Sequence, residues 1–367
     1  MKKICFLSDR NVYMQRICNL LVDNNFEVHL ICREPGGLPE NLFREQIVFH
    51  QLSSTALINK IIEIKKILKD VKPDYVHVHG IFKDAFIPGL TFNRCYQYYI
   101  TFWGSDLNLF SRKPLNKIFQ NIAILFCDKI HLLSEQFSHQ LKNTYFNVNP
   151  VKIEIFSWGI DFSCYQNPDP ALIQNMRTKL KINPSDPVIL SYRNHKALYN
   201  HHTLIRSIAS VIKTFPNAKF IFTRGNADDN YVHETLSFVQ EHKLENNFIF
   251  INHWFSDAEL SALVNMAKVC VNIPLTDGQP ATLFEIMATK AIPIVSSLDN
   301  YRPFFQNGVN GFYLKNINDS EELSEIIIMA IKNYTEIAQP IYRSNNQYIM
   351  KYHDWNINSK KQIDLYD

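Results

Sequence analysis

The sequence predicts an α/β protein that is built from two doubly wound domains of similar size. Three observations lead to this prediction. Short apolar runs alternate with helical patterns up to about residue 296, the alternation lapses once near the middle, and a length of 367 residues suits two domains. Successive strand, helix and strand patterns form βαβ units, which require parallel sheets that are buried on both faces.

The first half of the chain opens on such a βαβ pattern. Apolar residues fill 4–7 and 28–32, and Ile17, Leu20 and Leu21 between them are spaced as on one face of a helix. The further elements expected in this half are a helix at 56–70 and strands at 75–79, 98–102, 129–133 and 153–156.

Prolines around 168–170 and 184–187 interrupt the alternation and predict a linker. A second series follows, with strands expected at 188–191, 219–223, 248–251, 269–273 and 292–296 and helices at 201–214, 228–243, 256–266 and 281–290. We therefore expect a first domain at 1–165 and a second at 166–340. In such folds ligands bind at the carboxyl ends of the strands.

The composition excludes several classes of protein. A hydrophobic content of 46% excludes a disordered or collagen-like chain. The net charge of +3 is too small to indicate a nucleic-acid partner. The seven cysteines are scattered and form no C-x-x-C pair, so neither a disulfide framework nor a zinc module is expected. No apolar run has the length of a signal peptide or a membrane span, which predicts a soluble cytoplasmic protein.

The segment 274–288, PLTDGQPATLFEIMA, is the most informative about function. Asp277 lies in a loop after an expected strand, and Glu285 follows in the expected helix. The free N–H groups at the start of a helix suit a diphosphate, and a carboxylate one turn further can accept hydrogen bonds from two sugar hydroxyls. A structural alternative stays open, because Thr282 and Glu285 also have the spacing of a capping box.

This segment resembles the E-x7-E region of the GT-B glycosyltransferases of family 4, where that region binds the nucleotide-sugar donor. Asp277 replaces the first glutamate of the pattern, and Glu285 matches the second. Further segments resemble the family along most of the chain: 100–106 (ITFWGSD), 157–161 (SWGID), 191–206 with Arg193, 292–297 (IPIVSS) and 310–312 (NGF).

The resemblance implies that the second domain binds the donor. Arg193 and Lys196 would hold the diphosphate, since fixed positive charge stabilises a departing nucleoside diphosphate, although Arg193 could instead pair with a surface acid. Glu285 would hold the ribose, and Asp277 would face the donor sugar. The predicted donor contacts are Arg193, Lys196, Asp277, Gly278, Gln279, Pro280, Ala281, Thr282, Leu283 and Glu285.

The first domain would then present the acceptor. The predicted acceptor-side residues are Asp9, Arg10, His79, Gly80, Trp103, Gly104 and Ser105. Trp103 stands where many relatives have a histidine, so it would supply shape and stacking instead of acid–base chemistry. Asp106 is the nearest polar side chain and is predicted to be catalytic together with Asp277 and Arg193, although Ser105-Asp106 is also an ordinary helix start.

No metal or other cofactor is expected. The chain has no Asp-x-Asp sequence, and its histidines have no zinc-binding spacing. A membrane surface is an expected partner for a different reason. Arg112, Lys113 and Lys117 open a strongly apolar helical segment, and residues 1–161 hold 19 basic and 15 acidic side chains. This pattern indicates peripheral contact with the inner membrane face.

Taken together, the resemblance implies a GT-B fold with two Rossmann-like domains across a cleft, and with residues 341–367 crossing back to the first domain. The implied activity is retaining transfer, of the hexosyltransferase type, from a nucleoside-diphosphate sugar to a saccharide or lipid-linked saccharide hydroxyl in cell-surface polysaccharide synthesis. Two alternatives stay open: a nucleotide-sugar 2-epimerase of the same fold, and a catalytically idle sugar-nucleotide-binding partner subunit.

Overall fold

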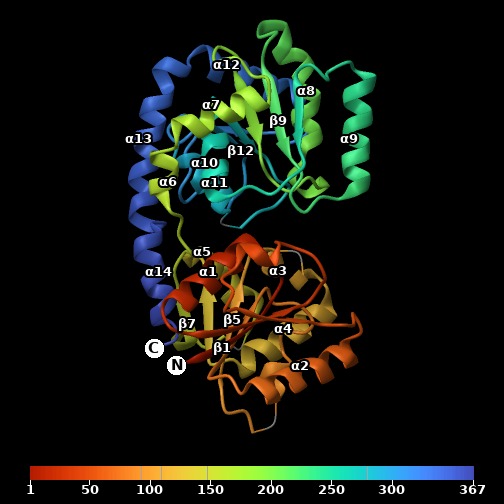
Figure 1. Ribbon diagram of the computed structural model, residues 1–367, viewed down its shortest axis with the longest axis vertical. Helices are drawn as coiled ribbons and strands as arrows, with labels where there is room; N and C mark the ends of the chain where they lie inside the picture. The colour runs from red at the N-terminus through yellow and green to blue at the C-terminus, as the bar shows by residue number, and fades with distance from the viewer. Residues whose placement is uncertain (92, 109, 147, 279) are drawn as a thin grey trace. The chain divides into compact units, whose positions relative to one another are not determined.

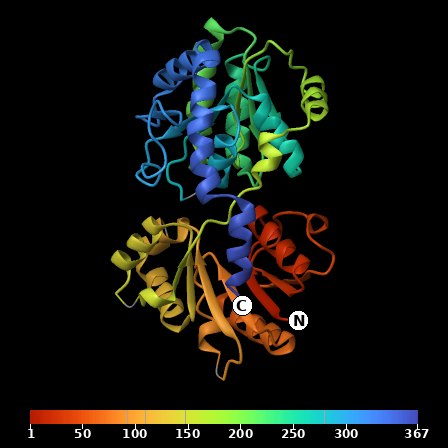
Figure 2. The same ribbon diagram turned by 90° about the vertical axis from the view of Figure 1, so that its left-hand side faces the viewer.

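The computed structural model describes residues 1–91, 93–108, 110–146, 148–278 and 280–367, without the side chains of Ser105 and Asn108. The chain divides into two compact units, Met1–Trp158 with Asn356–Asp367, and Gly159–Trp355. Both chain ends therefore lie in the first unit (Figure 2). Of the segment 341–367 that we expect to join the first domain, residues 341–355 belong to the second unit.

The described part of the first unit is built on a parallel sheet of seven strands in the order β3-β2-β1-β4-β5-β6-β7. Four central strands are almost wholly buried, as a parallel sheet requires. The strands are β1 (Lys3–Ser8), β2 (Glu27–Cys32), β3 (Val48–Gln51), β4 (Tyr75–His79), β5 (Gln97–Phe102), β6 (Lys129–Leu132) and β7 (Ile153–Ile155). The predicted doubly wound α/β fold is confirmed here.

The helices of the first unit cover both faces of this sheet. They are α1 (Val12–Asp23), α2 (Leu57–Val71), α3 (Ser105–Asn108), α4 (Pro114–Phe126), α5 (Glu135–Thr144) and the C-terminal α14 (Trp355–Asp364). The connections through α2 and α4 run in one direction along the sheet, and the connection through α1 runs in the other. Because such crossovers are right-handed, α2 and α4 lie on the same face and α1 lies on the opposite one (Figure 1).

The second unit repeats this architecture with six strands in the order β10-β9-β8-β11-β12-β13. The strands are β8 (Val188–Ser191), β9 (Lys219–Thr223), β10 (Phe248–Ile251), β11 (Val269–Asn272), β12 (Ile292–Ser296) and β13 (Phe312–Leu314). The helices are α6 (Phe162–Gln166), α7 (Pro170–Lys179), α8 (His201–Thr214), α9 (Asp229–Glu241), α10 (Asp257–Met266), α11 (Ala281–Met287), α12 (Ser320–Lys332) and α13 (Tyr334–Tyr352).

Three elements differ from the prediction. The proline cluster at 168–170 marks the start of α7, where Asp169 is the N-cap and Pro170 the first helical residue, and is therefore no linker. The edge strand β3 was missed because its residues are half-exposed and form no apolar run. Helix α11 ends at Met287, three residues short of the expected 281–290.

Candidate functional site

In the second unit, polar residues gather at the carboxyl ends of neighbouring strands. Tyr192 and Arg193 directly follow β8, and Asn272 is the last residue of β11, which pairs with β8. Asp277 lies in the loop between β11 and α11. Since parallel strands end at the same edge of a sheet, this edge is where ligands of such folds bind.

Arg193 and Asp277 form a partly buried ion pair at this edge. The Nη1 of Arg193 donates to Asp277 Oδ2 over 2.8 Å and to Asn272 Oδ1 over 3.1 Å. The Tyr301 hydroxyl donates to the same Asp277 oxygen over 3.0 Å. Both charged side chains are 12% exposed. Two of the predicted catalytic residues, Arg193 and Asp277, are therefore brought together as an ion pair.

The ion pair leaves donor capacity on the arginine. Among the described residues, Nε and Nη2 of Arg193 make no hydrogen bond, and its guanidinium carbon lies 4.4 Å from the centre of the Tyr199 ring. Burial by itself lowers the pKa of Arg193, but attraction from Asp277 and then Tyr199 and Tyr301 raises it overall. Arg193 is thus permanently charged and has N–H groups left for an anionic ligand.

Glu285 lies inside α11 and is only 4% exposed. The Tyr192 hydroxyl lies 2.8 Å from the Thr282 carbonyl oxygen and 3.2 Å from Glu285 Oε2. Burial and then the Glu285 carboxylate raise the pKa of Tyr192 well above its usual value, so the hydroxyl stays a donor. The capping box is not formed, because α11 has Pro280 as its N-cap and no side-chain cap bond.

The remaining predicted donor contacts differ in what they can offer. Lys196 is half-buried at the start of a short turn, and Ala281 and Thr282 are half-buried on α11. Gly278 donates its N–H to Asp277 Oδ1 over 2.9 Å. Leu283 must be withdrawn, because its side chain is wholly inside the hydrophobic core and its N–H donates to the Pro280 carbonyl. Gln279 lies outside the described residues.

In the first unit, the predicted acceptor-side residues lie at or directly after the carboxyl ends of the neighbouring strands β1, β4 and β5. Arg10 donates to Glu40 Oε1 over 2.7 Å, and Asp9 Oδ1 accepts from the Glu34 N–H, so both are tied to the loop after β2. Gly80 has a φ of +75°, and a Cβ there would meet the Phe82 ring at 2.7 Å, which explains the glycine.

The structure contradicts a catalytic role for Asp106. Its side chain is wholly buried, and its two oxygens accept from the backbone N–H groups of Ile81, Trp103, Gly104 and Leu107. Burial raises the pKa of Asp106, although these four hydrogen bonds lower it. Asp106 therefore fastens the loop after β4 to the loop after β5 and has no oxygen left for a substrate.

Trp103 belongs to an aromatic cluster that the sequence did not predict. Its ring centre lies 5.6 Å from Tyr13, 6.1 Å from His79 and 5.1 Å from Trp158. Neither ring nitrogen of His79 has a partner in the described part of the chain, and burial lowers its pKa well below the usual value. His79 is therefore a neutral ring that holds both a donor and an acceptor.

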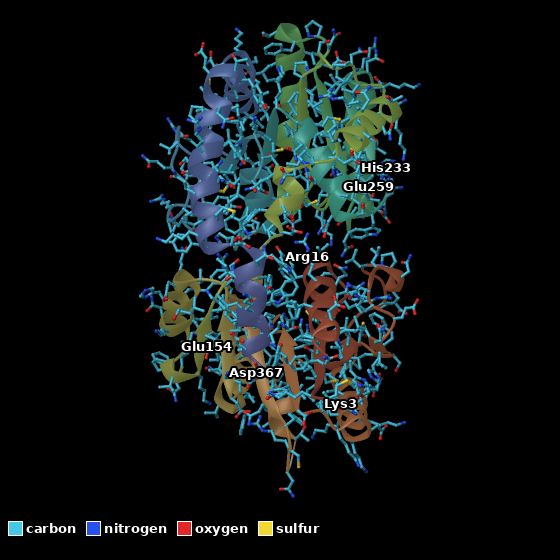
Figure 3. All side chains as sticks on the ribbon, turned by 60° about the vertical axis from the view of Figure 1, so that its left-hand side comes forward. Lys3, Arg16, Glu154, His233, Glu259 and Asp367 are labelled. Atoms are coloured by element: carbon cyan, nitrogen blue, oxygen red, sulfur yellow. The ribbon has the colours of Figure 1, made fainter. Side chains whose placement is uncertain are left out.

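Other features of the structure give weaker indications of a functional site. A groove of about 350 Å³ lies between α8 and α9 and is lined by His202, Arg206, His233 and Glu234 among others. His233 is labelled in Figure 3. The described residues contain no group of three or more His, Cys, Asp or Glu that could hold a metal ion. Within the same residues, no helix is long and apolar enough to cross a membrane.

Two family models match the sequence in turn. Residues 3–136 match the model described as "Glycosyl transferase 4-like", and residues 173–347 match "Glycosyl transferases group 1". No curated protein sequence matches the chain.

Solved structures similar to this one cover the whole chain. HepE from Anabaena in complex with UDP and glucose has a TM-score of 0.82 at 15% identity, over 100% of this chain and 99% of its own. Sucrose-phosphate synthase from Thermosynechococcus elongatus has a TM-score of 0.80 at 13% identity, over 100% and 98%. A variant of S. aureus TarM in complex with Fondaparinux, alpha-GlcNAc-glycerol and UDP has a TM-score of 0.74 at 11% identity, and the match covers 100% of both chains. At these identities the likeness shows the fold alone.

Proposed function

Because this chain is a glycosyltransferase of the GT-B fold, we propose that it transfers a hexose from a nucleoside-diphosphate sugar with retention of anomeric configuration. The proposed acceptor is a hydroxyl of a saccharide or lipid-linked saccharide used in cell-surface glycan synthesis on the cytoplasmic side of the membrane. The second unit would bind the donor and the first unit would bind the acceptor.

The observation that carries this proposal is the state of Arg193. A partly buried guanidinium at the carboxyl end of β8 keeps Nε and Nη2 unbonded among the described residues, while Asp277 and Asn272 fix its Nη1. Those remaining N–H groups suit the two-oxygen geometry of a phosphate. A fixed cation beside the leaving diphosphate stabilises the charge that this group gains in the transition state.

Glu285 supports the donor assignment independently. A buried carboxylate needs hydrogen-bond donors, and the Tyr192 hydroxyl is shared between Glu285 and the Thr282 carbonyl. A carboxylate can accept hydrogen bonds from two vicinal ribose hydroxyls. On the acceptor side, the half-buried ring of Trp103 suits an uncharged saccharide face, which stacks on aromatic rings, and the buried Trp158 and neutral His79 pack against this ring.

The full-length chain should be mixed with UDP- and GDP-linked hexoses and its melting followed. A matching donor at 100 times its Kd should stabilise the fold by about 2.7 kcal/mol. The matching donor is then incubated alone and with membrane-extracted glycolipid acceptors. Transfer with unchanged anomeric configuration, read by NMR of the product, is the expected result. An epimerised donor would indicate the 2-epimerase, and binding without any turnover would indicate the idle subunit.

We propose that the donor site works without a metal ion. Arg193 already supplies a fixed positive charge, and Lys196 lies three residues further along the chain. We expect transfer to continue in excess EDTA at an unchanged rate. If EDTA abolished transfer and Mn²⁺ or Mg²⁺ restored it, the diphosphate would be bridged by a metal and this site would be wrong.

A further inference from the structure

Helix α4 in the first unit is apolar on the face that points away from the core of that unit. Leu115, Ile118 and Leu125 are 54–63% exposed, and Phe126 at the end of the helix is 40% exposed. Counted from Ile118, Leu115 lies three residues before, and Leu125 and Phe126 lie seven and eight residues after. This spacing places the four side chains along one side of the helix. Exposed apolar residues are normal when they are scattered, but a stripe of this length marks an interaction surface.

The contacts on the inner face of α4 strengthen the inference that its outer face is an interaction surface. There, the buried Gln120 donates to the carbonyls of Ile81 and Asp106 and accepts from the Tyr145 hydroxyl. Ala123 and Ile124 are buried on the same inner face, so α4 carries apolar side chains on both its inner and its outer face. A helix with apolar side chains on opposite faces is normally covered on both. A layer of apolar matter is therefore expected on the outside of α4.

Positive charge accompanies this stripe. Arg112 and Lys113 precede the helix and are exposed, and Lys117 lies on its first turn, whereas residues 107–127 contain no acidic side chain. At the opposite end of the stripe, Asp128 lies two residues beyond Phe126 and is paired with Arg94, so this end adds no net charge. A flat surface that combines acyl chains with negative headgroups complements this arrangement better than a protein partner does.

Helix α2 repeats the pattern on the same face of the sheet. Ile58 and Ile62 are 73% and 62% exposed, and Lys65, Lys66 and Lys69 follow on the exposed side of the helix. The acids on α2 are Glu63, which bonds Ser53, and Asp70, so the cations remain in excess. Two helices on one face thus expose isoleucine or leucine together with lysine or arginine.

We propose that the α4 stripe, helped by α2, docks the first unit onto a membrane surface rich in anionic lipid. Leu115, Ile118 and Leu125 would enter the boundary between headgroups and acyl chains, while Arg112 and Lys113 would pair with lipid phosphates. The inference gives a location to the proposed function, since a lipid-linked acceptor lies in such a surface. Only this link to the acceptor rests on the proposed function, because binding of the protein to a membrane can be measured without any sugar.

The test is co-sedimentation of the full-length chain with vesicles, in the absence of nucleotide sugar. Vesicles of phosphatidylcholine mixed with phosphatidylglycerol should bind the protein, and vesicles of phosphatidylcholine alone should not. Each basic residue near an anionic surface strengthens binding roughly fivefold. Arg112→Gln with Lys113→Gln should therefore weaken binding about 25-fold, and added salt should weaken the wild type.

A second variant tests the apolar part. Leu115→Gln with Ile118→Gln should weaken binding at least tenfold, and its melting temperature and nucleotide-sugar binding should match the wild type. The matched controls are Lys179→Gln with Lys181→Gln and, separately, Leu236→Gln, which are exposed positions in the second unit and should bind as the wild type does.

Three results would overturn the proposal. One is absence of binding to the anionic vesicles, and another is equal binding by the α4 variants and the wild type. The third is a concentration-dependent dimer, seen by analytical ultracentrifugation, that Leu115→Gln with Ile118→Gln abolishes, because α4 would then face a second copy. Failure of the proposed function would look different, since it would appear as lost donor binding with vesicle binding intact.

Discussion

Arg193 shows how a single side chain joins stability and chemistry. Its ion pair with Asp277 is only 12% exposed on either side, and Tyr301 and Asn272 complete the hydrogen bonding. The order of residues predicts a cation near the end of a strand. The sequence could not reveal that Asp277 is the ion-pair partner of Arg193, because the two residues lie 84 positions apart and meet only in the fold.

Replacing Arg193 by alanine should therefore lower both activity and stability. We expect Arg193→Ala to reduce kcat/KM by roughly 10²–10³, as the loss of one preorganised transition-state donor does. It should also destabilise the protein by about 1–3 kcal/mol, because Asp277 loses its charged partner. Arg302→Ala is the control, because the Arg302 pair with Asp299 is exposed. Turnover within threefold of the wild type would mean that Arg193 has only a structural role.

Glu285 is the residue where the ligand-binding hypothesis can be separated from a structural one. Glutamine keeps an acceptor for the Tyr192 hydroxyl but replaces a charged double acceptor by a neutral amide. Charged hydrogen bonds are about twice as strong as neutral ones, so Glu285→Gln should lose about 1.5–3 kcal/mol of donor binding. That is a loss of roughly ten- to over a hundredfold. Calorimetric titration measures it, and unchanged affinity in a stable variant would exclude ribose binding.

A buried chain of hydrogen bonds fastens the C-terminal residues to the sheet of the first unit. Tyr366 OH lies 2.5 Å from His77 Nδ1, His77 Nε2 lies 2.7 Å from Thr101 Oγ1, and Thr101 Oγ1 lies 3.1 Å from His131 Nδ1. His131 Nε2 ends the chain at the Phe156 carbonyl. Because a carbonyl only accepts, every proton in the chain must point from Tyr366 towards Phe156.

Because of these hydrogen bonds, we expect the loss of the Tyr366 hydroxyl to destabilise the first unit locally. Tyr366→Phe removes the first donor and should lower the free energy of unfolding by about 1–2 kcal/mol. Amide hydrogen exchange of β4 and α14 reports the loss, and the strands of the second unit should exchange as in the wild type. Tyr313→Phe is the control for removing a partly buried, hydrogen-bonded tyrosine hydroxyl in the second unit. Unchanged exchange in β4 would show that packing alone holds the C-terminus.

At the level of elements, the sequence was informative wherever apolar residues were consecutive or helically spaced. Most strands of both sheets were predicted because a parallel sheet buries both faces. The half-exposed β3 left no such signal, and the role of Asp106 was misread because its four partners are backbone groups, which no side-chain pattern records. The position of Tyr366 beside His77 could not be predicted, because they lie 289 residues apart.

Across the whole molecule, buried histidines make stability depend on pH. Burial lowers the pKa of His131 and of His195 to about 4, and that of His201 to about 3. In the unfolded chain these groups titrate near 6.5. Below that pH the unfolded state binds more protons, so stability that is complete above pH 6.5 is lost as the pH falls towards 4.

The free energy of unfolding should fall by up to about 1.4 kcal/mol per pH unit for each such histidine as the pH is lowered. Urea unfolding between pH 7 and 4 measures it, and His131→Gln should flatten the curve by one histidine's share. A free energy of unfolding that stays constant from pH 6.5 to 5 would contradict the neutral state of these buried rings.

The central claim is that the second unit recognises a nucleoside-diphosphate sugar through Arg193 and Glu285. Isothermal titration calorimetry of UDP- and GDP-linked hexoses into the full-length chain, with EDTA present throughout, tests it most directly. We predict that one donor binds, that its free nucleoside diphosphate competes with it, and that both Arg193→Ala and Glu285→Gln weaken binding at least tenfold. Absence of heat with every nucleotide sugar, or equal affinity in both variants, would contradict the account.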